Sequence, residues 1–338
     1  MAYHMLFIFI LLLILLCIFS NENGTVIKLL DQNMALPDYR TNTNISKEIV
    51  HNIPIQNKTP PYMWVYWELV RGAKTPPPYI DLCLDIIKKN GSRYFNVVIL
   101  NEKNIFTYIP DLRKDINTLP IALKTDYIRV KLLYMYGGLW IDADTILMNN
   151  LHAIALKLAK GVDFIGFGCT GKICKDNEGY GKPSNGIMGS VRHGKLITMC
   201  LQSLDLKLDE YYSIHNDKKK EFNYFELGKL IIWNEYKKLM INDPMYRMFH
   251  VSSNMDGTRD KDGRWVAPDL IFKPRVNHII QYQDMNKLLV VMLANSIYCG
   301  DDPKYNWFCK LTRDQILGSN YFISYLFKKA INYDPNKN

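Results

Sequence analysis

The stretch Lys124–Leu147, with the sequence KTDYIRVKLLYMYGGLWIDADTIL, decides how the rest of the chain is interpreted. Its first part has helical spacing, and Gly137-Gly138 ends the predicted helix Ile121–Tyr136. A short apolar strand, Leu139–Ile141, follows and runs directly into Asp142-Ala143-Asp144. Residues two apart in an extended chain point the same way, so we expect both carboxylates to face one cleft.

Asp142 and Asp144 have the chemistry of a divalent-cation site. Two carboxylates at the end of a strand repel each other and lose hydration, and a hard cation that bridges them to a diphosphate relieves both effects. Phosphate oxygens and water would complete the coordination shell, so the protein needs only one or two carboxylates. We therefore predict Mg²⁺ or Mn²⁺ at these residues.

Asp126 and Arg129 lie three residues apart in the predicted helix and therefore on one face. Taken alone, this pair would be interpreted as a surface ion pair, and a bare Asp-x-Asp as a solvated turn. The combination is much narrower: an acid–base pair on a helix, a double glycine, an apolar strand with an aromatic residue, and then two aspartates.

This combination resembles the glycosyltransferases that carry a DxD sugar-binding region. It is especially similar to the capsular polysaccharide synthesis family, and more distantly to the large clostridial glucosylating toxins. The matching residues are Thr125-Asp126-Tyr127-Ile128-Arg129, then Gly137–Asp144, with Tyr66-Trp67-Glu68 at the end of an earlier strand. The similarity extends over Pro60–Leu151 and is thin beyond it, where 183–186 (PSNG) and 224–225 (YF) are weaker matches.

The resemblance implies a role for each matching residue. Trp67 would stack on the nucleotide base, or else belong to the core. Asp126 and Arg129 would hold the hydroxyls of the donor sugar, with Arg129 keeping the carboxylate ionised. Asp142 would contact ribose and sugar, and the metal through water, while Asp144 would bind the metal directly. Asn185 would contact the sugar, or else lie in a plain turn.

The resemblance also implies the reaction. A sugar would pass from a nucleotide-diphosphate-sugar, with a UDP-sugar favoured, to a glycan, polysaccharide or glycoconjugate acceptor, with retention at the anomeric carbon. The candidate catalytic residues are Asp126, Arg129, Asp142 and Asp144. The family's C-terminal loop with a His or Trp that helps to bind the metal has no clear counterpart here, which leaves the third metal ligand open.

The surrounding pattern indicates an α/β fold. Strands are expected at Tyr62–Leu69, Phe95–Leu100 and Val162–Gly166, and a helix at Tyr79–Lys89. Strands that alternate with helices predict a mostly parallel sheet flanked by helices, a GT-A-like (Rossmann-like) architecture in terms of the family. Ligands of such sheets bind beyond the carboxyl ends of the strands.

The N-terminus predicts a membrane tether. Met5–Phe19 is apolar without interruption, and we interpret residues 1–20 as an uncleaved signal-anchor helix rather than a cleaved signal peptide. Residues 21–59 read as a stem linker, with glycosylation sequons at Asn23, Asn44 and Asn57. The expected protein is therefore single-pass, with its catalytic domain in an extracytoplasmic compartment such as the ER or Golgi lumen.

Two further segments complete the predicted organisation: a catalytic domain over residues 60–310 and a C-terminal amphipathic helix with a tail over 311–338. The helix Tyr321–Ile331 would pack on the domain or lie on a membrane surface. Cys169 with Cys174 and Cys299 with Cys309 are spaced to close small loops, as disulfides or as free buried thiols.

Composition excludes several classes of protein. The 338 residues are 48% hydrophobic and 22% charged, which excludes global disorder. The net charge of +9 is modest and the basic residues are scattered, so no nucleic-acid partner is expected. That basicity suits a phosphorylated ligand or an anionic surface.

Two rival functions remain open at this point. A haloacid-dehalogenase-type phosphatase also has an apolar strand running into Asp-x-Asp, but its motif favours Thr or Val where Ile146 stands, and it gives Asp126 and Arg129 no purpose. A non-catalytic, membrane-anchored glycan-binding glycoprotein would need no intact Asp-x-Asp.

Overall fold

A computed structural model describes residues 59–70, 72–169, 182–214, 221–251, 255–257, 259–260, 266, 271–273, 285–300 and 303–334. All of them belong to the compact unit Asn52–Asn338. The predicted signal-anchor, nearly all of the stem and the sequons at Asn23, Asn44 and Asn57 lie outside the described residues.

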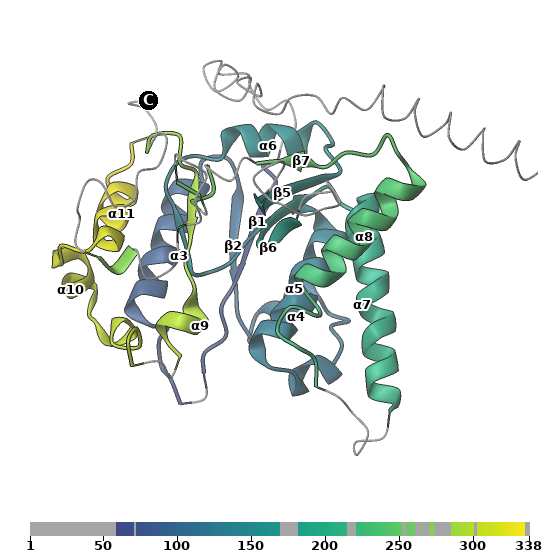
Figure 1. Ribbon diagram of the computed structural model, residues 1–338, viewed down its shortest axis with the longest axis horizontal. Coiled ribbons are helices and arrows are strands. Elements are labelled where there is room, and N and C mark those ends of the chain that lie inside the picture. Colours follow the sequence, from purple (N-terminus) through teal and green to yellow (C-terminus); the bar gives the residue numbers. More distant parts are fainter. Residues whose placement is uncertain are drawn as a thin grey trace, which may run out of the picture. The chain divides into compact units, whose positions relative to one another are not determined.

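A six-stranded sheet forms the centre of the molecule, in the order β2-β1-β3-β6-β5-β7 (Figure 1). β1 is parallel to β2 and β3, and β5 is parallel to β7, whereas β6 is antiparallel to both of its neighbours. β6 is thus the one reversed strand of this sheet, and the predicted mostly parallel α/β sheet is confirmed. The strands are β1 (Tyr62–Tyr66), β2 (Asn96–Leu100), β3 (Gly138–Ile141), β5 (Phe164–Cys169), β6 (Lys182–Ser190) and β7 (Phe249–His250).

Two hydrophobic cores cover the two faces of this sheet, because alternate residues of each strand point to opposite sides. Met63 and Val65 of β1 belong to one core, and Trp64 and Tyr66 to the other. β3 divides in the same way, since Leu139 and Ile141 lie on the first face and Trp140 on the second.

The first face is covered mainly by α3 (Pro78–Gly91), α10 (Arg313–Gly318) and α11 (Phe322–Ile331). α6 (His152–Ala159), α9 (Asn295–Tyr298) and a small antiparallel sheet of β4 (Thr145–Leu147) and β8 (Val290–Met292) belong to the same core. Ile323, Leu326 and Phe327 of α11 are buried in it, so the apolar face of the C-terminal helix packs on the domain. The capping box of Thr312 and Gln315 opens α10.

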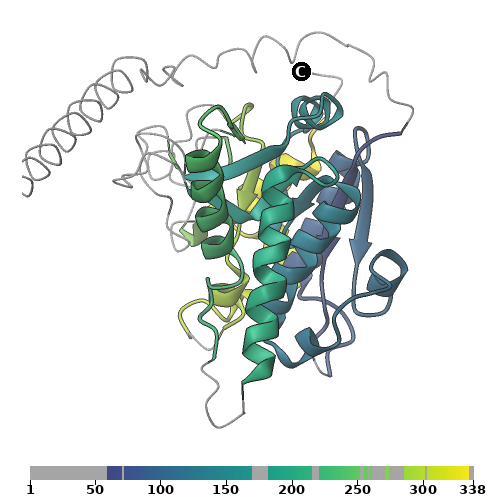
Figure 2. The ribbon, with the colours of Figure 1, turned by 90° about the vertical axis from the view of Figure 1, so that its right-hand side faces the viewer.

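The second face is covered by α4 (Ile105–Tyr108), α5 (Ile121–Tyr136), α7 (Lys195–Ser213) and α8 (Lys229–Asn242). Figure 2 looks onto this side, where the long helix α7 lies beside α8. Short 3₁₀ turns at Asp115–Thr118 and Phe308–Lys310 complete the described elements. Within the described part of the chain, no helix has the length and apolar character needed to cross a membrane.

The double glycine after α5 is required by close backbone approach. Gly137 and Gly138 have φ angles of +68° and +103°, which favour glycine. A Cβ on Gly137 would come within 2.6 Å of the Arg192 backbone nitrogen, and the Gly137 carbonyl accepts a 2.8 Å hydrogen bond from Trp64 Nε1. The turn therefore directs the chain from α5 into the middle of the sheet, where β3 pairs with β1.

Candidate active site

A cavity of about 990 Å³ opens at the carboxyl ends of β1 and β3. Its volume is at the upper end of the ~300–1,000 Å³ usual for ligand pockets. Segments far apart in the sequence form its wall, including the chain after β1, the α5 face and the start of α8. All six residues predicted as a site line this cavity: Trp67, Asp126, Arg129, Asp142, Asp144 and Asn185.

Asp142 is the first residue after β3, and its backbone N–H donates to the Gly186 carbonyl at 2.8 Å. A Cβ on Gly186 would come within 2.8 Å of Asp142 Oδ2, so the glycine leaves room for the carboxylate. Because β6 is reversed, its N-terminal half lies at the same edge of the sheet as the C-terminal end of β3. This places Asn185 beside the two aspartates.

Asp126 and Arg129 are buried and form a polar cluster with the half-buried Asn185. Arg129 Nη2 lies 3.3 Å from Asp126 Oδ1, and Asn185 Nδ2 donates to the same oxygen at 2.7 Å. Arg129 Nη1 donates to the backbone carbonyl of Asn185. Asp126 and Arg129 are 4% and 5% exposed, so the predicted pair faces inward and is not a surface ion pair. Its side chains are held in one orientation, as groups that grip a ligand require.

Burial changes the titration of Asp126. Desolvation raises the pKa of this carboxyl to about 6, even though Arg129 and Asn185 favour the charged form. A carboxyl with a pKa of about 6 is still mostly ionised at pH 7, but burial raises this pKa by more than Arg129 lowers it. The reason is that the carboxylate has exchanged water for a nearly dry position between α5 and β6.

The Asp142 side chain is 31% exposed and joins this cluster to the cavity. Its Oδ1 accepts a 2.8 Å hydrogen bond from Trp140 Nε1 and lies 3.4 Å from Arg129 Nη2. Burial raises the pKa of Asp142, and Arg129 and Trp140 oppose that shift. Arg129 also stacks over the Trp140 ring at 5.2 Å, so strand β3 helps to hold the guanidinium.

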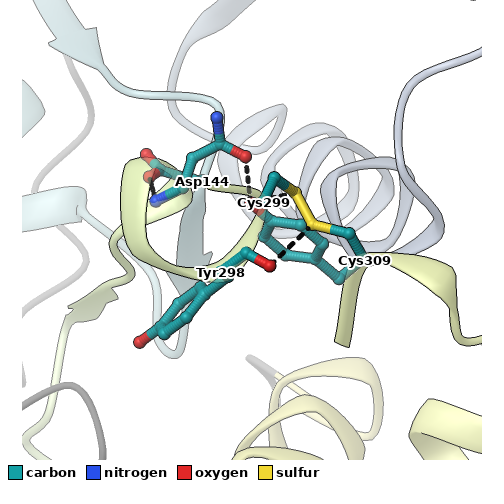
Figure 3. The surroundings of a disulfide bond; sticks show 6 residues. Asp144, Tyr298, Cys299 and Cys309 are labelled. Carbon is teal, nitrogen blue, oxygen red and sulfur yellow. Dashed lines mark hydrogen bonds between the residues drawn. A yellow bond between two sulfur atoms is a disulfide. The ribbon is translucent and has the colours of Figure 1, made fainter. Parts of the chain in front are cut away.

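Asp144 is held by the chain that enters α9. The Asn295 backbone N–H donates to Asp144 Oδ2 at 2.9 Å, and the Asp144 carbonyl accepts from Leu293 N at 2.9 Å. Figure 3 shows Asp144 facing this segment, which the Cys299–Cys309 disulfide ties to the chain that follows it. Of the cysteine pairs considered from the sequence, this one is bonded, whereas Cys174 lies outside the described residues.

The aspartates fit a divalent cation. Burial and the negative charge of Asp142 raise the pKa of Asp144 to about 7, which shows that the two carboxylates repel each other. A cation between them would remove that repulsion, and both side chains line an open cavity. Among the described residues no cluster of three or more His, Cys, Asp or Glu could complete a metal shell.

Trp67 follows β1 directly, and its backbone N–H donates to the Leu100 carbonyl at 3.0 Å. The predicted strand Tyr62–Leu69 is thus longer than β1, which ends at Tyr66. The Trp67 side chain is partly buried at the cavity wall, and its Nε1 is buried without a hydrogen-bond partner among the described residues. Base stacking by Trp67 stays a prediction.

Several cavity residues were not anticipated from the sequence. Lys229 begins α8 and lies in the field of Asp126 and Asp142, while burial lowers the pKa of its ammonium group. Gly228 caps the same helix, and a Cβ there would come within 2.6 Å of Asp126 Oδ2. Asn295 binds Asp144 from about 150 residues away in the sequence. No local pattern marks these positions, because each depends on a distant contact.

Comparison with protein families identifies the chain. The family described as "Capsular polysaccharide synthesis protein" matches residues 20–252. The chain belongs to this family. The family resemblance drawn from residues 125–144 and 66–68 is thereby confirmed. No match was found among curated proteins.

Solved glycosyltransferase structures share a distant likeness with the chain. The PaToxG glycosyltransferase is 14% identical, with a TM-score of 0.37 over 55% of this chain and 70% of its own. Glycosyltransferase GlyE of Streptococcus pneumoniae TIGR4 is 12% identical, with a TM-score of 0.38 over 81% of this chain and 65% of its own. Galactosyltransferase LgtC, solved with donor and acceptor sugar analogues, is 11% identical, with a TM-score of 0.37 over 81% and 98%. These likenesses are too distant to assign a property to this chain.

Proposed function

We propose that the chain is a metal-dependent glycosyltransferase with a GT-A-like catalytic domain. Its donor is a nucleotide-diphosphate-sugar, with a UDP-sugar favoured, and its acceptor is a glycan, polysaccharide or glycoconjugate. Transfer retains the anomeric configuration. Residues 1–20 tether the enzyme to a membrane, residues 21–59 form the stem, and the catalytic domain faces an extracytoplasmic lumen of the ER or Golgi type.

One observation carries this proposal: two mutually repelling carboxylates and a buried Asp–Arg–Asn cluster line the same cavity at the carboxyl edge of the sheet. Asp142 and Asp144 suit a cation bound to a diphosphate. Asp126 and Arg129 suit the hydroxyls of a hexose, which need donors and acceptors in fixed directions. A ligand that contains both a diphosphate and a sugar satisfies the two halves together.

The residues divide the work of transfer. Mn²⁺ or Mg²⁺, held by Asp144 and by Asp142, would neutralise charge on the departing diphosphate. Lys229, whose ammonium group lies near Asp126 and Asp142, adds positive charge on the same side of the cavity. Asp126, Arg129 and Asn185 orient the sugar, and Trp67 supports the base. No general base is assigned, since a retaining transferase of this type is not expected to need one.

Calorimetry with purified protein tests the proposal. UDP and a panel of nucleotide-sugars are titrated with Mn²⁺ and with EDTA, and hydrolysis of the same panel is followed by release of the nucleotide. We expect at least one nucleotide-sugar to bind with Mn²⁺ and to be hydrolysed slowly, and EDTA to remove both signals. Absence of binding with or without metal would overturn the proposal. A phosphomonoester and a free glycan are tested beside the panel. Cleavage of the phosphomonoester would favour the phosphatase, and binding of the glycan without Mn²⁺-dependent binding of any nucleotide-sugar would favour the glycan-binding protein.

A further inference from the structure

Two exposed aromatic side chains stand at the rim of the cavity. Tyr224 and Phe225 are 59% and 47% exposed, and both line the cavity. Two exposed aromatic rings side by side place a large apolar area in contact with water. Such an apolar area beside a polar site requires a physical explanation. This pair is not among the residues proposed above to bind the donor or the cation.

The two rings form a corner. Their centroids lie 5.2 Å apart and their planes are nearly perpendicular, at 88°. Lys229 Nζ sits 4.7 Å from the centre of the Phe225 ring, so Phe225 is supported on one face by a cation. Among the described residues, Phe225 is the one aromatic ring that contacts Tyr224, and no cation lies over the Tyr224 ring. One face of the Tyr224 ring is therefore available to a ligand, and the neighbouring Phe225 ring is held in place by Lys229.

The position of Tyr224 is fixed relative to the sugar-binding residues. Three residues after Phe225, Gly228 packs against Asp126 and Asn185. Tyr224 lines the same cavity as Asp126, Asp142 and Asp144, the carboxylates proposed for the sugar and the cation. The exposed ring thus stands beside the end of the cavity where the reacting sugar would lie.

We propose that Tyr224, braced by Phe225, is the stacking platform for a pyranose ring of the acceptor. This inference rests on the proposed function and names its second substrate site. A pyranose has one face of C–H groups, which packs on an aromatic ring, and a rim of hydroxyls, which needs polar neighbours. The Tyr224–Phe225 corner offers both, since its apolar surface lines the same cavity as Asp126, Asp142 and Asp144.

Saturation-transfer NMR with simple sugars tests the platform without requiring turnover. The probes are methyl and hexyl pyranosides of glucose, galactose, mannose and N-acetylglucosamine, added to the protein with UDP and with Mg²⁺, which is diamagnetic. We expect at least one methyl pyranoside to receive saturation on the ring protons of one face. Tyr224→Ala should weaken this binding about tenfold, and Tyr224→Trp should preserve it. Phe106→Ala, which removes a 49% exposed aromatic side chain outside the cavity lining, is the matched control and should leave the signal unchanged.

Each other outcome contradicts the platform. If no methyl pyranoside binds, or if Tyr224→Ala binds as well as the wild type, the acceptor is not a pyranose stacked on Tyr224. If hexyl pyranosides bind through their alkyl chain alone, the rim holds an apolar chain instead. Failure of the glycosyltransferase proposal looks different, because the wild type would then bind no nucleotide with Mn²⁺ in the parallel calorimetry. Circular dichroism of each variant separates lost binding from lost folding.

Discussion

At the residue scale, Asp144 is the most direct test of the proposed cation. Its carboxylate accepts a hydrogen bond from Asn295 N at 2.9 Å, and its pKa is raised to about 7 by burial and by Asp142. Asp144→Asn keeps an acceptor for Asn295 but removes the charge. We expect both Asp144→Asn and Asp144→Ala to lose Mn²⁺-dependent nucleotide binding by about a hundredfold or more, with transfer abolished. Calorimetry measures the loss, and circular dichroism should show an unchanged fold. Wild-type binding by Asp144→Asn would contradict the metal assignment.

Gly228 is a second residue whose environment makes a sharp prediction. A Cβ at this position would meet Asp126 Oδ2 at 2.6 Å and would also contact Asn185 Nδ2. Those atoms hold the buried cluster, so Gly228→Ala should displace Asp126 and weaken nucleotide-sugar binding about tenfold or more, with less effect on free nucleotide. Gly318→Ala, where nothing lies within 4 Å of the added Cβ, is the control and should be neutral or slightly stabilising. If Gly228→Ala and the wild type bound the nucleotide-sugar with equal affinity, Asp126 would not be a sugar-binding residue.

At the element scale, local signals predict the helix and strands around the site. The predicted helix Ile121–Tyr136 has the same bounds as α5, because Pro120 precedes it and Gly137 ends it. The predicted strand Phe95–Leu100 differs from β2 by one residue. The pairing of β4 with β8 could not be predicted, because Thr145 and Met292 are far apart in the sequence and each strand has three residues. Likewise, Asn295 and Lys229 join the site through tertiary contacts that no local pattern encodes.

A second point at the element scale is the disulfide that follows α9, which leads to a prediction about stability. The Cys299–Cys309 disulfide closes a loop of 10-residue separation directly after the helix that holds Asp144 (Figure 3). A loop of this length stabilises by about 2–3 kcal/mol in the chain-entropy model. The double variant Cys299→Ser/Cys309→Ser should therefore unfold several degrees lower than the wild type without reductant. With reductant, the wild type and the double variant should unfold at the same temperature. The difference seen without reductant can then be attributed to this disulfide. Equal unfolding temperatures without reductant would contradict its stabilising role.

At the scale of the whole molecule, the two hydrophobic cores and the cavity follow from the alternation of side chains along the strands. β1 and β3 send alternate side chains into the two cores, and their ends deliver Trp67 and the aspartates to one edge. Sequence periodicity predicts that alternation and the edge, and it directs Asp142 and Asp144 to one cleft, whereas the roles of the other four cavity residues came from the family resemblance. Periodicity does not predict which distant helix borders this edge of the sheet. The place of Gly228 and Lys229 at this edge is visible in the folded chain alone, and the folded chain also shows that residues 224–225, a weak family match in the sequence, form an exposed aromatic corner there.

The whole molecule should also lose stability in acid through His250. This residue ends β7, pairs in register with Gly166, and has a buried Nδ1 without a partner among the described residues. Burial lowers its pKa to about 4 from its ordinary 6.5. The unfolded chain therefore takes up the proton first, so stability is present above pH 6.5 and is lost as the pH falls through about 4.

Urea unfolding of the wild type and of His250→Phe measures this contribution. Phe keeps an aromatic ring against Tyr236, whose ring centre lies 6.4 Å from that of His250, but it cannot be protonated. Between pH 7 and pH 4.5 the wild type should lose about 2 kcal/mol of unfolding free energy more than the variant does. The difference in unfolding free energy between the wild type and the variant must grow as the pH falls. All other titrating groups are common to both proteins, so their contributions cancel. Two parallel curves would mean that His250 is protonated in the folded state as easily as in the unfolded chain, and that its burial does not control its charge.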